Sequence, residues 1–182
     1  MEREHRVLIG RERIASRVAQ IGRALAQDLA AEPQSDRVVL VPILTGSMVF
    51  VADLIRHIPL KMSIRPVTLS SYPGQATQSQ GVTLRGEIPT DLAGAHVVVI
   101  DDILDSGRTL GLLKRMIQAQ RPASIRLCVL LSKRKPSGRD EEISVDFAGF
   151  EIDDEFVVGY GLDYDGYFRN LPDIVTLSPE SS

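Results

Sequence analysis

The stretch that decides the fold is VVVIDDILDSGRTL, residues 97–110, in which an apolar run is followed by acidic residues and a small-residue loop. Val97–Ile100 form a short, continuously apolar segment, typical of a parallel strand that is covered on both faces. Beyond the loop, Leu110, Leu113 and Ile117 recur at helical spacing. The sequence therefore predicts a buried strand that leads, through an acidic turn, into an amphipathic helix.

The turn itself combines negative charge with an anion-binding pattern. Asp101, Asp102 and Asp105 lie where the strand is expected to emerge, and like charges this close repel unless cations or hydroxyl donors engage them. Residues 106–109 open the helix, where free backbone N–H groups and the helix dipole attract anions. The combination predicts a phosphorylated sugar that binds with the help of a metal ion. The alternative is an acid-rich turn in which Asp105 or Ser106 only caps the helix.

Length and composition predict one compact domain. The 182 residues are 43% hydrophobic and 25% charged, which suffices for a full core and excludes compositional disorder. The net charge of −3 argues against a nucleic-acid partner. No segment approaches the roughly 20 apolar residues of a membrane span, and the N-terminus lacks the apolar region of a signal peptide. We therefore expect a cytoplasmic protein without nucleic-acid or membrane partners.

Apolar strands alternate with helical segments, which predicts an α/β fold with a mainly parallel central sheet flanked by helices. Helices are expected at 14–29, at about 49–55 and at about 110–119, and strands at 37–44, about 62–69, 82–85, 97–100 and 125–131. Beyond Ser132 the pattern breaks into shorter pieces that are typical of a small cap.

Cysteine and histidine are sparse. Cys128 is alone within the strand-like IRLCVLL, so it can form no internal disulfide and is expected to be a small buried hydrophobe. His5, His57 and His96 lack metal-ligand spacing, and we expect all three at the surface.

The run DSGRT, residues 105–109, resembles the D-[ST]-G-x-T phosphate-binding loop of the type I phosphoribosyltransferases, which follows an acidic pair at a strand end. The segments TGSMVFVADL, SSY, LLSK and FVVGYGLDYDGYFRNLP are similar to the hypoxanthine (guanine) phosphoribosyltransferase branch, and the similarity extends from Val38 to Pro172. The resemblance implies a phosphoribosyltransferase-type fold in a single domain over 1–182. Its core is expected at about 35–135, and a small hood from the N-terminal segment and about 140–182.

The resemblance also implies an activity. The family transfers the 5-phosphoribosyl group of phosphoribosyl pyrophosphate to a purine base and releases pyrophosphate. A 6-oxopurine, hypoxanthine and also guanine, would give IMP or GMP in purine salvage. Charge separation in an oxocarbenium-like transition state implies Mg²⁺ as cofactor. The family also implies a homodimer or homotetramer. Two alternatives stay open: a xanthine- or uracil-directed enzyme, and a non-catalytic nucleotide-sensing regulator of the same fold.

The resemblance also implies a role for individual residues of these motifs. Asp105 is the expected catalytic residue, facing N7 of the purine. The ribose and 5-phosphate are expected to contact Asp101, Asp102, Asp105, Ser106, Gly107, Arg108 and Thr109. Pyrophosphate is expected at Thr45, Gly46 and Arg169, the purine at Lys133, Phe156, Val157 and Asp163, and metal at Asp101, Asp102 and Asp163. Ser71 and Tyr72 open a polar segment that is expected to act as a lid.

The purine-specific lysine can be argued from its chemistry. A lysine ammonium only donates hydrogen bonds, so beside the purine 6-position it favours a carbonyl over an amino group. Lys133 is preferred because it lies two residues after the Leu130–Leu131 pair, as the family lysine does, and Lys135 is the alternative.

The chain departs from the family pattern at several positions. Thr45 stands where Lys or Arg is common, which should weaken pyrophosphate binding, and the Leu44–Thr45 peptide is often cis in the family. Asp101 stands where glutamate is more usual, so its contact with the ribose is expected to run through water or metal. Pro73 and Gly74 in the expected lid are also unusual.

Overall fold

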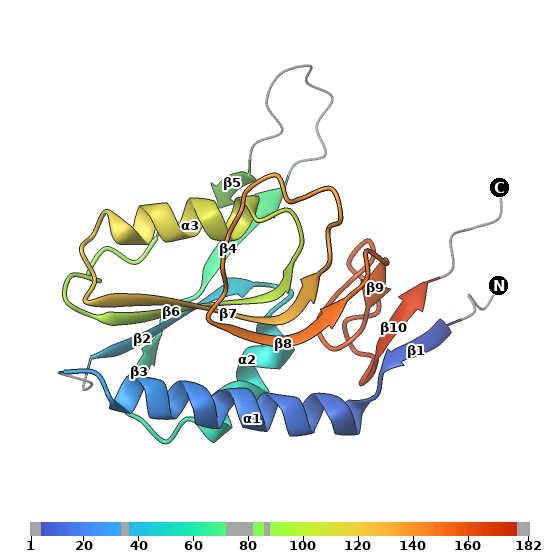
Figure 1. Ribbon diagram of the computed structural model, residues 1–182, viewed down its shortest axis with the longest axis horizontal. Coiled ribbons are helices and arrows are strands. Elements are labelled where there is room, and N and C mark those ends of the chain that lie inside the picture. Colours follow the sequence, from blue (N-terminus) through green and yellow to red (C-terminus); the bar gives the residue numbers. More distant parts are fainter. Residues whose placement is uncertain (1–4, 34–36, 72–81, 86–87, 178–182) are drawn as a thin grey trace, which may run out of the picture.

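The structure is a computed structural model that describes residues 5–33, 37–71, 82–85 and 88–177 (Figure 1). Within these residues, the largest unit is a seven-stranded sheet in which the order β5-β4-β2-β6-β7-β8 forms the main path and β3 pairs with β2. The strands are β2 (Val38–Leu44), β3 (Met62–Ile64), β4 (Val67–Ser71), β5 (Val82–Arg85), β6 (His96–Leu104), β7 (Ser124–Lys133) and β8 (Phe147–Ile152). All pairs are parallel except β4 with β5, so the expected mainly parallel α/β sheet is confirmed.

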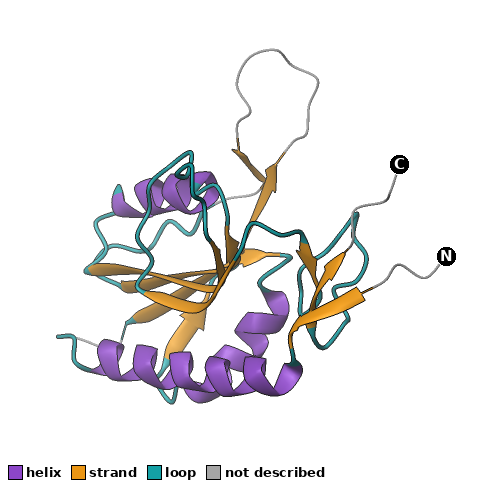
Figure 2. Cartoon of the chain, turned by 45° about the vertical axis from the view of Figure 1, so that its right-hand side comes forward, coloured by secondary structure: helices purple, strands orange, loops and turns teal. Residues whose placement is uncertain are grey.

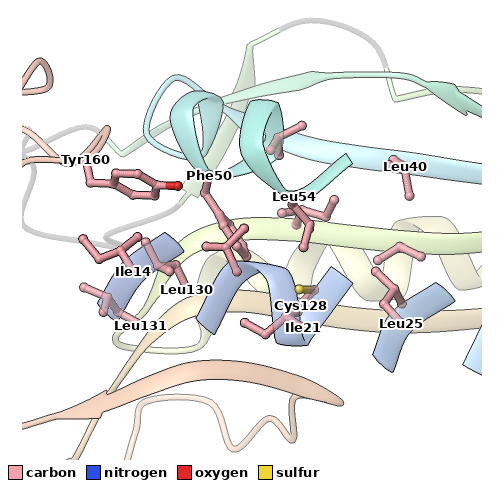
Figure 3. Close-up of a cluster of buried hydrophobic side chains, with 14 of the residues drawn as sticks. Ile14, Ile21, Leu25, Leu40, Phe50, Leu54, Cys128, Leu130, Leu131 and Tyr160 are labelled. Carbon is pink, nitrogen blue, oxygen red and sulfur yellow. The ribbon is translucent and has the colours of Figure 1, made fainter. Parts of the chain in front are cut away.

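Helices cover both faces of this sheet. Figure 1 shows α1 (Arg11–Ala30) and α2 (Met48–Leu54), with its 3₁₀ extension Ile55–His57, on one face and α3 (Arg108–Gln118) on the other. Successive residues of a strand point to opposite faces. In β6, Ile100 accordingly joins the buried cluster of α1 and α2, whereas Val99 joins the cluster of α3. Figure 3 shows the first cluster, in which side chains of α1, α2 and β7 meet.

The strand expected at 62–69 is divided into β3 and β4. The backbone N–H of Arg65 still donates to the carbonyl oxygen of Leu40 at 2.8 Å, but the next residue, Pro66, has no N–H to continue the ladder. β3 therefore pairs with the beginning of β2, and β4 with its end.

The central strands are longer than the apolar pattern predicts. β6 continues through Asp101 and Asp102 to Leu104 because β7 pairs with it along this length, up to Leu104 beside Ser132. The acidic pair thus lies inside the strand and not after it. Cross-strand pairing, which the apolar pattern does not encode, supports these extra residues.

A second, smaller sheet joins the two ends of the described chain. It is antiparallel, in the order β1-β10-β9, with β1 (His5–Ile9), β10 (Ile174–Leu177) and β9 (Val157–Val158). Figure 2 shows it to one side of the main sheet. The expected hood of about 140–182 is too wide at its start, because residues 147–152 form β8 of the central sheet and extend its parallel pairing beside β7.

The structure describes the exposure of Cys128, His57 and His96, and His57 is partly exposed. Cys128 is fully buried as expected, and burial raises the pKa of its thiol to about 12. The surface expectation is wrong for His96, which is 2% exposed. Its Nε2 lies 2.9 Å from the carbonyl oxygen of Pro33, and its Nδ1 lies 2.8 Å from the hydroxyl of Ser124. Because a carbonyl oxygen only accepts, Nε2 is the donor, and the ring is a satisfied polar residue of the core. None of the described helices is long and apolar enough to cross a bilayer.

Asp173 ties the C-terminal segment to the start of α1. Its carboxylate accepts from the backbone N–H of Arg11 at 2.8 Å and from the guanidinium at 2.9 and 3.2 Å, and these bonds lower the pKa of Asp173.

We expect Asp173→Asn to destabilise the protein at neutral pH and much less at pH 3. A carboxyl whose pKa is lower in the folded state stabilises the fold above its unfolded pKa of about 3.9, and this stabilisation is lost as pH falls through the folded value. Urea unfolding of both proteins at several pH values measures the gap. A gap of the same size at pH 7 and pH 3 would contradict the assignment.

Candidate active site

A cleft of about 380 Å³ opens at the carboxyl ends of β2 and β6, beside the start of α3. Ligands of open α/β sheets bind outside the carboxyl ends of the strands. The lining includes nine residues expected from the sequence: Gly46, Asp101, Asp102, Asp105, Ser106, Gly107, Thr109, Asp163 and Arg169. Residues far apart in the chain thus converge on one polar cleft, which Ile43, Leu44, Ile103, Leu104 and Leu110 complete.

The turn from β6 into α3 requires a glycine. Gly107 has φ of 84°, a left-handed conformation that disfavours side chains, and a Cβ atom there would overlap the carbonyl oxygen of Glu141. The hydroxyl of Ser106 accepts from the backbone N–H of Arg108 at 3.4 Å. The eleven-residue helix α3 begins at Arg108, and its second residue, Thr109, lines the cleft, so the N-terminal dipole of the helix faces the same space.

A loop between β7 and β8 holds this turn from outside. The backbone N–H of Glu141 donates to the carbonyl oxygen of Ser106 at 3.1 Å, and the Glu141 carboxylate pairs with Arg115 of α3. Asp140 pairs with Arg108 at 3.2 Å. Arg108, which the motif places at the phosphate, does not line the cleft, and the structure directs it to this loop.

The acidic pair is packed tightly against the loop after β2. Asp101 is 7% exposed, and its Oδ1 accepts from the backbone N–H of Asp102 at 3.0 Å. Burial raises the pKa of Asp101 well above its ordinary value, and the neighbouring carboxylate raises it further. Burial also raises the pKa of Asp102, against the opposing charge of Arg169. Gly46 leaves room for the Asp102 carboxylate, which a Cβ atom at that position would overlap.

The hood supplies an arginine and an aspartate to the same cleft. One guanidinium nitrogen of Arg169 pairs with Asp163 at 2.7 Å, and the other donates to the carbonyl oxygen of Gly161 at 2.6 Å. The second oxygen of Asp163 accepts from the backbone N–H of Gly166 at 2.8 Å. These contacts fix the planar guanidinium at the cleft, where its fork suits phosphate oxygens.

Two lysines flank Asp105. Lys133 ends β7 and lies 3.3 Å from Asp105 and 3.2 Å from Asp154, whereas Lys135 lies 2.7 Å from each. The hydrogen bonds to Asp105 and Asp154 raise the pKa of Lys135, and those from Lys135 and Lys133 lower the pKa of Asp154. Neither lysine lines the cleft itself, and both reach it through Asp105.

The other expected contacts lie outside the cleft lining. Phe156 is 51% exposed and packs edge-to-face against Tyr164, with ring centroids 5.5 Å apart. Val157 is buried in β9, within the core cluster of α1 and α2. Thr45 follows a cis peptide bond from Leu44. Of the expected lid, Ser71 is the last residue of β4, and Tyr72 lies outside the described residues.

Sequence reasoning missed several charged contacts of the site. Asp154, Asp140 and Glu141 form ion pairs with residues that lie 19 to 32 positions earlier, so only the fold brings them together. The acidic run 153–155 before Phe156 and the RDEE run at 139–142 are the only local signals for them.

The chain matches the family model described as "Phosphoribosyl transferase domain" over residues 11–165. It belongs to the phosphoribosyltransferase family. The matched span contains the phosphoribosyltransferase loop 105–109 and both lysines and ends before Arg169. The chain is 41% identical over 177 residues to the hypoxanthine-guanine phosphoribosyltransferase of Mycobacterium avium, covering 95% of this chain and 85% of the relative. It is 40% identical over 165 residues to the hypoxanthine phosphoribosyltransferase of Haemophilus influenzae, covering 91% and 90%.

Solved phosphoribosyltransferase structures share the fold over nearly the whole chain. A hypoxanthine phosphoribosyltransferase from Trypanosoma cruzi is similar with a TM-score of 0.88 at 35% identity, covering 99% of this chain and 94% of that one. A hypoxanthine-guanine phosphoribosyltransferase from Bacillus anthracis has a TM-score of 0.86 at 36% identity, covering 97% and 100%. The expected phosphoribosyltransferase-type fold is therefore confirmed.

Proposed function

We propose that this protein transfers the 5-phosphoribosyl group from phosphoribosyl pyrophosphate to a 6-oxopurine, hypoxanthine or guanine, and releases pyrophosphate. The observation that carries the proposal is the convergence of the acidic pair, the 105–109 loop and Arg169 on one cleft. The names of relatives about 40% identical over nearly the full chain support the same substrate class.

In the proposed complex, the 5-phosphate lies against residues 106–109. Backbone N–H groups at the start of α3 and the hydroxyls of Ser106 and Thr109 would donate to its oxygens. Arg169 would donate to the pyrophosphate, and the carboxylates of Asp101 and Asp102 would accept from the ribose hydroxyls. Each contact pairs a charged or hydroxyl group of the ligand with a group of opposite hydrogen-bonding character.

The residues of the cleft fit a magnesium ion that arrives with the diphosphate. Magnesium commonly binds one or two protein carboxylates and completes its shell with substrate oxygens and water. Asp101 and Asp102, which line the cleft, are the proposed protein ligands. Asp163 is the proposed ligand of a second ion. When bound, magnesium neutralises charge that develops on the departing pyrophosphate.

At the base, Asp105 is the proposed acceptor of the N7 proton while N9 attacks C1 of the sugar and the bond from C1 to pyrophosphate breaks. Loss of this proton makes the imidazole ring a better nucleophile. Lys133 would donate to the 6-carbonyl oxygen, and the half-exposed Phe156 offers a face for stacking. The homodimer or homotetramer that the family implies stays a prediction, measurable by sedimentation.

The test is nucleotide formation from phosphoribosyl pyrophosphate with hypoxanthine, guanine, xanthine, adenine and uracil. We expect product from hypoxanthine and guanine, and a kcat/KM for adenine lower by at least about 100-fold, since an amino group at position 6 leaves the lysine donor unpaired. A chelator should abolish turnover, and Mg²⁺ should restore it. Preference for uracil or adenine, or no product with any base, would contradict the proposal.

A further inference from the structure

Asp105, Asp154, Lys133 and Lys135 form a closed ring of alternating charge, which we call the four-charge ring. Each carboxylate gives one oxygen to each ammonium: Oδ2 of Asp105 and Oδ1 of Asp154 lie near Lys133, and the two remaining oxygens lie near Lys135. The ring links three segments: Lys133 and Lys135 lie at and just after the end of β7, Asp105 lies in the turn before α3, and Asp154 lies in the hood.

The two lysines hold this ring unequally. Both contacts of Lys135 are 2.7 Å, at the short end of the range for a charge-assisted hydrogen bond, whereas those of Lys133 are 3.2 and 3.3 Å. The looser contacts mark Lys133 as the ammonium that can turn to another acceptor. The shorter contacts mark Lys135 as the one that holds the two carboxylates.

From these contacts we infer that Lys135 is a positioning residue for Asp105. The inference rests on the proposed function, in which Lys133 turns to the purine and Asp105 faces the imidazole ring. When Lys133 leaves the ring, Lys135 still binds both carboxylates and keeps Asp105 oriented to receive the proton. The two lysines thus have different roles: Lys133 contacts the base, and Lys135 holds the proton acceptor Asp105.

Fold stability does not account for the ring. The side chains of Lys133 and Lys135 are 11% and 20% exposed, but the carboxylates of Asp105 and Asp154 are 44% and 49% exposed, and solvent screens ion pairs with such exposed partners. Arg134, the residue between the two lysines, serves as the control for lost positive charge. It pairs with Glu151 and Asp153 at 3.5 and 3.3 Å and forms no ion pair with Asp105.

The experiment compares Lys135→Met, Lys135→Arg, Lys133→Met and the control Arg134→Met in steady-state kinetics and in calorimetric binding of IMP. We expect K135M to lower kcat about tenfold and to leave both KM values and IMP affinity within about twofold, because Lys135 acts through the proton acceptor. K135R should keep kcat within about threefold, since a guanidinium can donate to both carboxylates.

The comparison variants should behave differently. K133M should raise the KM for the base and weaken IMP binding about tenfold, and R134M should match the unsubstituted protein. All melting temperatures should agree within about 3 °C, because methionine can keep the packing of the apolar lysine stem and the carboxylate partners are exposed to solvent.

The outcomes separate the two proposals. A kcat for K135M within about twofold of the unsubstituted protein, or a larger effect of K135M than of K133M on the KM for the base, would overturn the role of Lys135 alone. A K135R variant as slow as K135M would also overturn it. No nucleotide from the unsubstituted protein with any base would overturn the proposed function and this role together.

Discussion

Asp105→Asn is expected to lower kcat by about 100-fold or more, while IMP affinity changes by no more than about threefold. Removing a proton acceptor costs about 10²–10⁴-fold in rate. The amide of asparagine keeps the size of the side chain, so the turn before α3 and its phosphate contacts should persist. Stopped-flow kinetics and calorimetry of IMP binding measure the two effects separately.

Asp153→Asn is the control for lost negative charge in this region. Asp153 pairs with the exposed Arg134 and does not contact the four-charge ring, so its kcat should stay within about twofold of the unsubstituted protein. An undiminished kcat in the Asp105 variant would remove that residue as the proton acceptor. An equal loss in both variants would attribute the effect to net charge.

Gly107→Ala is expected to lower the free energy of unfolding by about 2–4 kcal/mol and to abolish most activity. The left-handed backbone costs an alanine about 1–2 kcal/mol, and the overlap of its Cβ with the carbonyl oxygen of Glu141 adds a similar amount. Relief of that overlap would move the loop that holds Ser106, and with it the expected phosphate contacts. Urea unfolding and the nucleotide-formation assay measure the two losses.

Gly94→Ala is the matched control. Gly94 also has positive φ, 70°, but no heavy atom lies within 4 Å of the position its Cβ would take. Only the backbone cost of about 1–2 kcal/mol should therefore appear, and kcat should not change. Equal destabilisation by the two alanines would show that the contact with Glu141 contributes nothing.

Hydrophobic periodicity predicted the main helices and strands, because an element that is buried on one or both faces has a regular spacing of apolar residues in its own sequence. Helix α1 and strands β2 and β7 lie close to the expected ranges for this reason. The prediction of one strand over 62–69 was wrong, because Pro66 has no N–H and divides the segment into two strands. Strand β8 has a weaker apolar pattern and depends on pairing with β7. His96 looked like a surface residue because its partners, Pro33 and Ser124, are distant in sequence.

In the candidate site, too, the contacts within one motif could be predicted from the sequence, and the contacts between distant segments could not. Residues within one motif, such as Asp102 and Ser106, converge on the cleft because a strand end and a helix start are neighbours in both sequence and space. The direction of Arg108 depended on Asp140, and the short contacts of Lys135 depended on Asp154, which the sequence places 19 residues away. Long-range pairing of this kind is set by the fold, and local spacing does not reveal it.

The most direct test of the proposed function is a crystal structure of the protein with bound IMP. We expect the 5-phosphate against residues 106–109, the ribose hydroxyls beside Asp101 and Asp102, and the 6-carbonyl oxygen within hydrogen-bond distance of Lys133. Ordered nucleotide elsewhere on the protein, with the cleft at the carboxyl ends of β2 and β6 free of ligand, would contradict the proposed function.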